Sequence, residues 1–215
     1  GSIIMIGIID YDAGNIKSVE KALQYLGQET VVSRDPQVLL KADKVILPGV
    51  GSFGDAMENL KKYGLVPVIH EIVEKGTPFL GICLGLQLLF ESSDETPGVE
   101  GLGILKGKIV RLPAESGLKI PHIGWNSLHL EKSGGLFQGL TGEPYVYFVH
   151  SYYLQAEENI ITSTTKYGAE IHASVQKGNV FACQFHPEKS SKWGLKILEN
   201  FAAVGKDGNT EKEGK

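Results

Sequence analysis

The stretch Phe79-Leu80-Gly81-Ile82-Cys83-Leu84-Gly85-Leu86-Gln87-Leu88-Leu89-Phe90 decides how this chain folds. Its apolar start is typical of a buried strand, and after Cys83 apolar residues recur at helical spacing. Gly81 and Gly85 lack a Cβ atom, so the backbone can turn sharply while the strand and the helix stay close together. The pattern predicts a strand–turn–helix elbow with a thiol at its tip, which is the geometry of a nucleophile elbow.

Two roles are open for Cys83 at this point. At a helix N-terminus the exposed amides and the helix dipole favour the thiolate, which is the nucleophilic form of the side chain. A free cysteine is more often a small buried hydrophobic residue, however, and glycines also flank ordinary tight turns. The elbow alone therefore marks Cys83 as a candidate nucleophile and leaves the structural role open.

Strands and helices alternate on the N-terminal side of the elbow. Segments 3–9, 29–33 and 44–47 have the apolar character of strands. Helical patterns follow at 16–26, around 56–60 and at 65–73. We expect Asn15 to cap the first helix. Alternation at this spacing predicts right-handed crossovers and a parallel sheet.

The C-terminal half differs, because short strands dominate it. They are expected at 108–112, 127–130, 145–154, 160–165, 171–175 and 180–185, with a final helix at about 191–204. The predicted fold class is therefore α/β: a doubly wound, mostly parallel central sheet with flanking helices, and additional antiparallel strands in the C-terminal half.

The composition is that of an ordinary globular protein. With 215 residues, 42% of them hydrophobic, the chain suits a single domain over 1–204, followed by a polar and disordered tail at 205–215. A net charge of −4 without a basic block argues against nucleic acid as a partner. No apolar run has the length of a membrane span, and no signal-peptide pattern is present, so we expect a cytoplasmic protein without a membrane partner.

The two cysteines and six histidines are not arranged as metal ligands. The cysteines lie about 100 positions apart and outside any C-x-x-C pair, which argues against a disulfide framework and a zinc site. The histidines show no ligand spacing either. We expect neither a metal nor an organic cofactor.

The segment Gln184-Phe185-His186-Pro187-Glu188-Lys189 supplies the acid–base partner that a cysteine nucleophile needs, together with a carboxylate beside it. An imidazole takes and returns protons near neutral pH, and side chains two apart on extended chain point the same way, so Glu188 can orient His186. The same alternation puts Cys183 on the opposite face of the preceding strand, with Phe181 and Phe185, where we expect it only to pack. Taken alone, His-Pro-Glu would also suit a surface turn.

The loop Pro48–Gly54 contains the spacing G-x-G-x-x-G, which suggests dinucleotide binding. We reject this interpretation because the loop follows the third strand, and the acidic residue at the expected offset, Glu74, lies within a helical pattern. Backbone amides of such a loop are better suited to an anion, for example a transient oxyanion.

The combined motifs resemble the class I, or triad, glutamine amidotransferases. Gly81–Gly85 matches the G-x-C-x-G elbow of that family, and His186-Pro187-Glu188 matches its late His-x-Glu. Within the family, the chain is most similar to the glutaminase subunits of imidazole glycerol phosphate synthases, and the resemblance covers almost its whole length. Four stretches carry this similarity: 47–54, 121–126, 147–152 and 186–191.

The resemblance implies a mechanism. Cys83 attacks the side-chain amide of glutamine, His186 protonates the departing ammonia, and Glu188 orients His186. The oxyanion hole is expected from the amide of Leu84 and from the loop that contains Val50 and Gly51. Because Val50 is β-branched, we expect this loop to rest with its amide turned away until an allosteric signal flips it. The expected glutamine contacts are Gly49, Gly51, Gln87, His150, Ser151 and Tyr152.

The resemblance also implies a partner. Ammonia is useful only if it travels along a sheltered path, and in this family a (β/α)8-barrel cyclase subunit receives it in a heterodimer. The complex would make imidazole glycerol phosphate and an aminoimidazole carboxamide ribotide in histidine biosynthesis. The expected docking surface is Pro121, Trp125, Asn126, Tyr147 and Lys189, although Trp125 would equally suit a core position.

Other interpretations stay open at this point. A paralogous amidotransferase could send ammonia to a nucleotide-sugar or cell-surface sugar synthase with the same glutaminase chemistry. A cysteine hydrolase on the same type of sheet often has histidine directly after its nucleophile, where this chain has Leu84. A catalytically silent binding subunit is disfavoured by the intact Cys83, His186 and Glu188.

Overall fold

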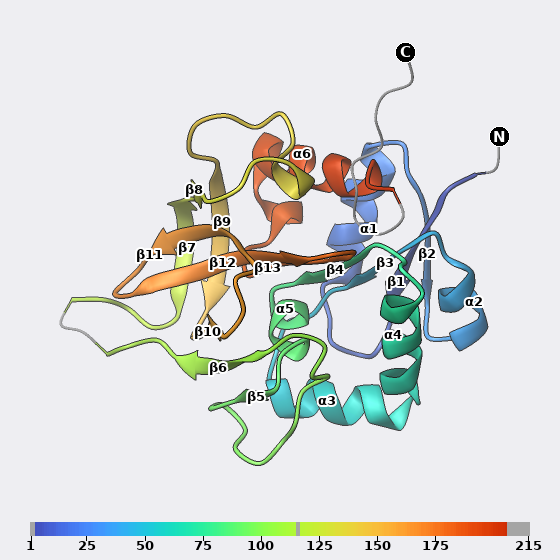
Figure 1. Ribbon diagram of the computed structural model, residues 1–215, viewed down its shortest axis with the longest axis horizontal. Coiled ribbons are helices and arrows are strands. Elements are labelled where there is room, and N and C mark those ends of the chain that lie inside the picture. Colours follow the sequence, from blue (N-terminus) through green and yellow to red (C-terminus); the bar gives the residue numbers. More distant parts are fainter. Residues whose placement is uncertain (1–2, 115–116, 206–215) are drawn as a thin grey trace.

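A computed structural model describes residues 3–114 and 117–205, which form an α/β structure around an eight-stranded sheet (Figure 1). Five strands of the sheet are parallel neighbours: β2 (Glu29–Ser33), β1 (Met5–Ile9), β3 (Lys44–Leu47), β4 (Phe79–Ile82) and β13 (Val180–Cys183). Three antiparallel strands extend it: β12 (Glu170–Lys177), β11 (Ile161–Lys166) and β8 (His129–Leu130). The predicted fold class is therefore confirmed.

Helices cover both faces of the parallel half (Figure 1). One core cluster joins the sheet to α1 (Ile16–Tyr25) and α6 (Ser191–Ala202). The other core joins it to α2 (Pro36–Lys41), α3 (Phe53–Lys62), α4 (Leu65–Glu74) and α5 (Leu84–Leu88). As the alternation predicts, Ala182 lies in the second cluster, whereas Phe181 and Cys183 lie in the first.

Smaller strands complete the C-terminal half. β10 (Tyr152–Ala156), β6 (Gly107–Arg111) and β5 (Ser92–Ser93) form a three-stranded sheet, and β7 (His122–Ser127) pairs with β9 (Tyr145–His150) in an antiparallel ribbon. Short 3-10 turns lie at Gly135–Phe137 and Pro187–Lys189. No helix within the described ranges is long and apolar enough to cross a membrane.

Several expected elements need correction. Segment 145–154 is two strands, broken at Ser151, and 127–130 is divided between the end of β7 and β8. Helix α2 was not expected; Asp35 caps it through its side chain. The expected polar tail falls outside the described residues from 206 onward, so the division into one domain and a tail stays a prediction.

Asn15 does not cap α1 as expected. It stands directly before the helix, but its φ of 63° is left-handed and its side chain makes no capping hydrogen bond. A capping residue normally has extended backbone angles so that its side chain can reach the first amides of the helix. Here the side chain points to another part of the chain, as described below.

The parallel pairing of β4 with β13 positions the candidate site. Ala182 lies opposite Gly81, Cys183 lies opposite Ile82, and the amide of Cys83 donates to the carbonyl of Cys183 at 2.8 Å. Both strands therefore leave the sheet at the same edge. Residues that are 101 positions apart, such as Cys83 and Gln184, come into contact there.

Candidate active site

Cys83 stands at the tip of a tight elbow between β4 and α5. Its φ of 54° is in the left-handed region, which is uncommon for any residue with a side chain and often marks a functional position. A Cβ atom on Gly81 would lie 2.6 Å from the carbonyl oxygen of Gly85, and one on Gly85 would lie 1.9 Å from that of Leu47. The elbow therefore requires glycine at both positions, as the sequence predicts.

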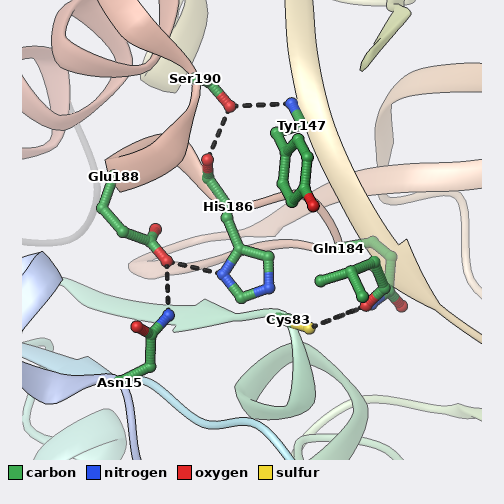
Figure 2. Close-up of polar contacts among 8 residues, drawn as sticks. Asn15, Cys83, Tyr147, Gln184, His186, Glu188 and Ser190 are labelled. Carbon is green, nitrogen blue, oxygen red and sulfur yellow. Dashed lines mark hydrogen bonds and ion pairs between the residues drawn. The ribbon is translucent and has the colours of Figure 1, made fainter. Parts of the chain in front are cut away.

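His186 and Glu188 form a buried pair beside this elbow (Figure 2). Nδ1 of His186 donates to Oε1 of Glu188 at 2.6 Å, and the two side chains are 1% and 0% exposed. The sequence predicts that the two side chains meet by alternation along extended chain, and this prediction is wrong. The chain turns into a 3-10 helix at Pro187, and this turn brings them together. The hydroxyl of Ser190 holds this turn by donating to the carbonyl of His186 at 2.6 Å.

The other nitrogen of His186, Nε2, points toward the sulfur of Cys83 (Figure 2). Nε2 is buried and has no hydrogen-bond partner within residues 3–114 and 117–205. Burial alone lowers the pKa of His186, but the interactions with Cys83 and Glu188 outweigh it and raise that pKa to about 10. The imidazole is therefore protonated at neutral pH, with its charge between the sulfur and the carboxylate.

Asn15 is a member of the site that sequence reasoning missed. Its Nδ2 donates to Oε1 of Glu188 at 3.2 Å, so the oxygen that accepts from His186 is held from a second side (Figure 2). The two residues are 173 positions apart, and no local pattern indicates their contact. The only sequence signal is an asparagine directly before a helix, which more often caps it.

A cavity of about 280 Å³ opens beside Cys83 and collects most of the expected glutamine contacts. The predicted residues that line it are Val50, Gly51, Leu84, Gln87, His150, Ser151 and Tyr152. Gly49 does not line it; its carbonyl accepts from the amide of Leu84 at 3.2 Å. Glu95 and Val149 also line the cavity and were missed. Pro121, which was expected on the docking surface, lies in the cavity wall as well.

The two amides expected to form the oxyanion hole are both engaged elsewhere. The amide of Val50 donates to the carbonyl of Ala13 at 3.0 Å, and that of Leu84 donates to Gly49. Neither can stabilise an anion while these bonds persist. The sequence predicts a resting loop in which the Val50 amide is turned away from the cavity, and the hydrogen bond to Ala13 is consistent with that prediction.

The ribbon of β7 and β9 presents aromatic side chains at the surface. Trp125 and Tyr145 are 43% and 50% exposed and stack with their centroids 5.8 Å apart, with the ring of Tyr147 edge-on to Trp125. Trp125 is therefore not a core residue. Asn126 is half-buried and donates to the carbonyl of Lys166 at 3.0 Å, whereas Lys189 is exposed beside the active-site turn.

Comparisons with known proteins agree on one family. The family described as "Glutamine amidotransferase class-I" matches residues 7–204. The "Imidazole glycerol phosphate synthase subunit HisH" of Moorella thermoacetica is 54% identical over 93% of this chain and 94% of its own length. Proteins of the same name from Methanocaldococcus jannaschii and Aquifex aeolicus are 51% and 55% identical, over 93% and 90% of this chain and 100% and 94% of their own.

Solved structures show the same fold at lower identity. A structure described as "Crystal structure of glutamine amidotransferase" is 23% identical, with a TM-score of 0.72 over 92% of this chain and 98% of its own. "Structure of PurLQS from Thermotoga maritima" matches with a TM-score of 0.73 and 22% identity, over 94% and 98% of the two chains. The matched family covers nearly the whole chain, including the cysteine elbow and the late histidine. This chain belongs to the class-I glutamine amidotransferase family.

Proposed function

We propose that this chain is the glutaminase subunit of an imidazole glycerol phosphate synthase, and that Cys83, His186 and Glu188 are its catalytic triad. The observation that carries the proposal is the β4–β13 junction, which aligns a thiol, an imidazole and a carboxylate beside a cavity of amino-acid size. This order of groups is that of a nucleophile, its acid–base partner and the group that orients the partner.

In the first half of the reaction, the sulfur of Cys83 attacks the carboxamide carbon of glutamine. His186 donates its Nε2 proton to the amide nitrogen, and the carbon–nitrogen bond breaks. Ammonia departs, and the glutamyl group stays bound to Cys83 as a γ-glutamyl thioester. The raised pKa of His186 suits this step, because the ring holds the proton before attack. Glu188 and Asn15 keep the imidazole in the tautomer and orientation that present Nε2 to the sulfur.

In the second half, His186 acts as a base. It takes a proton from water, the hydroxide attacks the thioester carbon, and the carbon–sulfur bond breaks. The carboxyl product loses its proton to solvent and leaves as glutamate, and the Cys83 thiolate is regenerated beside the protonated His186. The imidazole side chain is 1% exposed, so the water that it activates would have to enter through the cavity after ammonia has left. Glu95 gives the cavity a carboxylate that suits the α-ammonium group of glutamine.

The proposed oxyanion donors are the amides of Val50 and Leu84, and both must be released before they can act. Each now donates to a backbone carbonyl, at 3.0 Å and 3.2 Å. A preorganised pair of donors accounts for much of the rate enhancement in acyl transfer, so their absence keeps turnover low. The proposed activating event is therefore a change of the Val50 peptide orientation, driven by the docked partner and its ligand.

The proposed partner is a (β/α)8-barrel cyclase subunit. Three relatives between 51% and 55% identical carry the name of an imidazole glycerol phosphate synthase subunit, which favours this partner over a sugar-modifying synthase. The exposed Trp125 and Tyr145 offer the large aromatic surface that protein interfaces use as anchors. We also propose a cytoplasmic location, which the free thiols of Cys83 and Cys183 support.

A labelling experiment tests the proposal. The chain is mixed with a barrel cyclase and its ribotide substrate, and amide-15N glutamine is supplied. We expect glutamate formation to rise only when both cyclase and ribotide are present, and the label to enter the imidazole product. The Cys83→Ala variant should lose the glutamine-dependent reaction while ammonium salts still support the cyclase.

Two outcomes contradict different parts of the proposal. Absence of glutaminase activity in all mixtures would overturn the triad assignment. A rate of glutamine hydrolysis that is the same with and without the cyclase and its ribotide would overturn the partner assignment and favour the paralogous amidotransferase.

A further inference from the structure

Two buried histidines beside the cavity have no part in the proposed reaction. His122 on β7 and His150 on β9 pair across the ribbon, and the residues are only 3% and 6% exposed. Nδ1 of His122 lies 3.0 Å from Nε2 of His150. Because the partner of one ring nitrogen decides which nitrogen carries the proton, the neighbours of the pair determine what each ring can do.

The carbonyl of Tyr152 sets the direction of hydrogen bonding. It lies 2.9 Å from Nδ1 of His150, and a carbonyl only accepts, so Nδ1 carries the proton. Nε2 of the neutral His150 ring then has a lone pair, which accepts the Nδ1 proton of His122. Burial lowers the pKa of His122 to about 4 and that of His150 to about 3, so both rings are neutral at pH 7.

Asn126 fixes the other end of this chain of bonds. Its Nδ2 lies 3.5 Å from Nε2 of His122 and also donates to the carbonyl of Lys166 at 3.0 Å. Its Oδ1 accepts from the amide of Ser127 at 2.8 Å. Rotation of the carboxamide would break the last two bonds, so the amide orientation follows from its neighbours. All donors therefore point from Asn126 toward the cavity.

The same carbonyl connects the histidines to the cavity lining. Nε2 of Gln87 donates to Tyr152 O at 3.2 Å and to Oε1 of Gln184 at 3.1 Å. These two bonds use both protons of the Gln87 carboxamide, which presents its oxygen as the acceptor. Gln87, His150 and Tyr152 all line the cavity. An acceptor in this place suits the N–H groups of glutamine.

We propose that His122 is a positioning residue for glutamine binding. It donates to Nε2 of His150 and so holds the ring whose Nδ1 donates to the Tyr152 carbonyl. That carbonyl in turn orients the Gln87 carboxamide. The inference rests on the proposed function, since it takes glutamine as the ligand of this cavity. His122 touches no ligand itself, because its ring is stacked between Phe148 and Tyr167, with centroids 4.7 Å and 3.9 Å away.

Three substitutions separate the hydrogen bond of His122 from its packing. His122→Phe keeps a ring in the stack but has no donor. His122→Asn puts an amide nitrogen near the position of Nδ1, whereas His122→Gln puts it near that of Nε2. In the complex with the cyclase, we expect the KM for glutamine to rise about fivefold to twentyfold in the Phe and Gln variants. In His122→Asn it should stay within about twofold of the wild-type KM, and kcat should change little in all three.

Tyr167→Leu is the matched control, because it removes the other ring of the stack without touching the donors. It should lower the Tm, because a stacked ring and the hydrogen bond from the Tyr167 hydroxyl to the Lys119 carbonyl are lost, and it should leave KM unchanged. A KM within about twofold of wild type in both His122→Phe and His122→Gln would overturn the inference, as would an equal rise in Tyr167→Leu. If His122→Phe fails to fold, the comparison of Asn with Gln decides.

The failure of the proposed function has a different signature. In that case wild-type chain shows no glutaminase activity with or without the cyclase. Calorimetric titration with glutamine then replaces KM, with the same expected ratios of Kd among the variants. An active wild-type enzyme with unchanged KM values in the variants refutes only the positioning role of His122.

Discussion

The two sides of the cavity around Cys83 are held in different ways. On the nucleophile side, the sheet register of β4 and β13 aligns Cys83 with the segment of His186, and the side chains there are buried. On the oxyanion side, Val50 is 38% exposed and its amide is held by one hydrogen bond to Ala13. The first side is preorganised, whereas the second can change with the orientation of one peptide. In the proposed mechanism, the first side would be ready for catalysis, and the second would be the side on which regulation acts.

The largest expected effect comes from removing the sulfur. Cys83→Ala should lower glutaminase turnover by about 10⁴-fold or more, because no other group forms the thioester. Cys183→Ala is the matched control: that thiol is 0% exposed in the same apolar core as Cys83 but does not line the cavity, and its removal should leave turnover within about threefold. Stopped assays of glutamate release measure both. Comparable losses in the two variants would contradict the assignment of a single nucleophile.

The rigidity of the nucleophile side is tested by adding one methyl group to each side. Gly85→Ala would put a Cβ 1.9 Å from the Leu47 carbonyl and should lower the free energy of unfolding by about 3 kcal/mol or more. A Cβ atom on Gly51 would have no atom within 4 Å, so Gly51→Ala is strained only by the backbone φ of +113°. This strain should lower the free energy of unfolding by about 1–3 kcal/mol. Denaturant unfolding of both variants measures the difference. Equal losses would show that the two sides are equally rigid.

The buried ion pair predicts how stability depends on pH. The pKa of His186 rises from 6.5 to about 10 on folding, so its stabilising contribution is complete below about pH 6.5 and is lost as pH rises through 10. Glu188→Gln removes one cause of the raised His186 pKa. The substitution should therefore lower the free energy of unfolding more at pH 7 than at pH 10. Turnover should also fall about 10²-fold to 10⁴-fold.

Unfolding by denaturant at several pH values measures this effect. Glu199→Gln is the matched control, because Glu199 pairs with Lys196 at the surface, where its side chain is 54% exposed. This control should change stability by less than about 1 kcal/mol at each pH. A Glu188→Gln destabilisation that is constant with pH would contradict the charged state of His186.

The smallest expected effect sharpens the comparison at the oxyanion side. Val50→Gly relaxes a β-branched residue and should let the peptide turn more often, which raises basal glutaminase activity about fivefold. The measurement is glutamate release by the chain without its partner. Unchanged basal activity would mean that Val50 does not limit the turn.

Local patterns predict the nucleophile side well. The 3.6-residue and two-residue periods, together with Gly81 and Gly85, are enough to place the elbow, because steric demands there act between near neighbours. That Cys83 and His186 meet was expected from the resemblance, whereas the parallel pairing of β13 with β4 that brings them together was not among the sequence predictions. What the sequence signals most clearly is backbone shape.

Contacts between distant side chains were not predictable in this way. Asn15 binds Glu188 across 173 positions, and His122 meets His150 because β7 and β9 pair, although β7 was not among the expected strands. The break at Ser151 within an apolar run also left no signal. Whether Val50 and Leu84 donate to carbonyls depends on single peptide orientations, which residue identity biases but does not determine.

The pairing of β4 with β13 has a consequence for how such a protein diversifies. The chain between these two strands, which includes the aromatic ribbon, begins and ends at neighbouring positions of the sheet. The ribbon of β7 and β9 lies outside the eight-stranded sheet, so its exposed residues can change without altering the register of β4 and β13. The proposed docking surface around Trp125 and Tyr145 can therefore vary in sequence while the sulfur and the imidazole keep their relative positions.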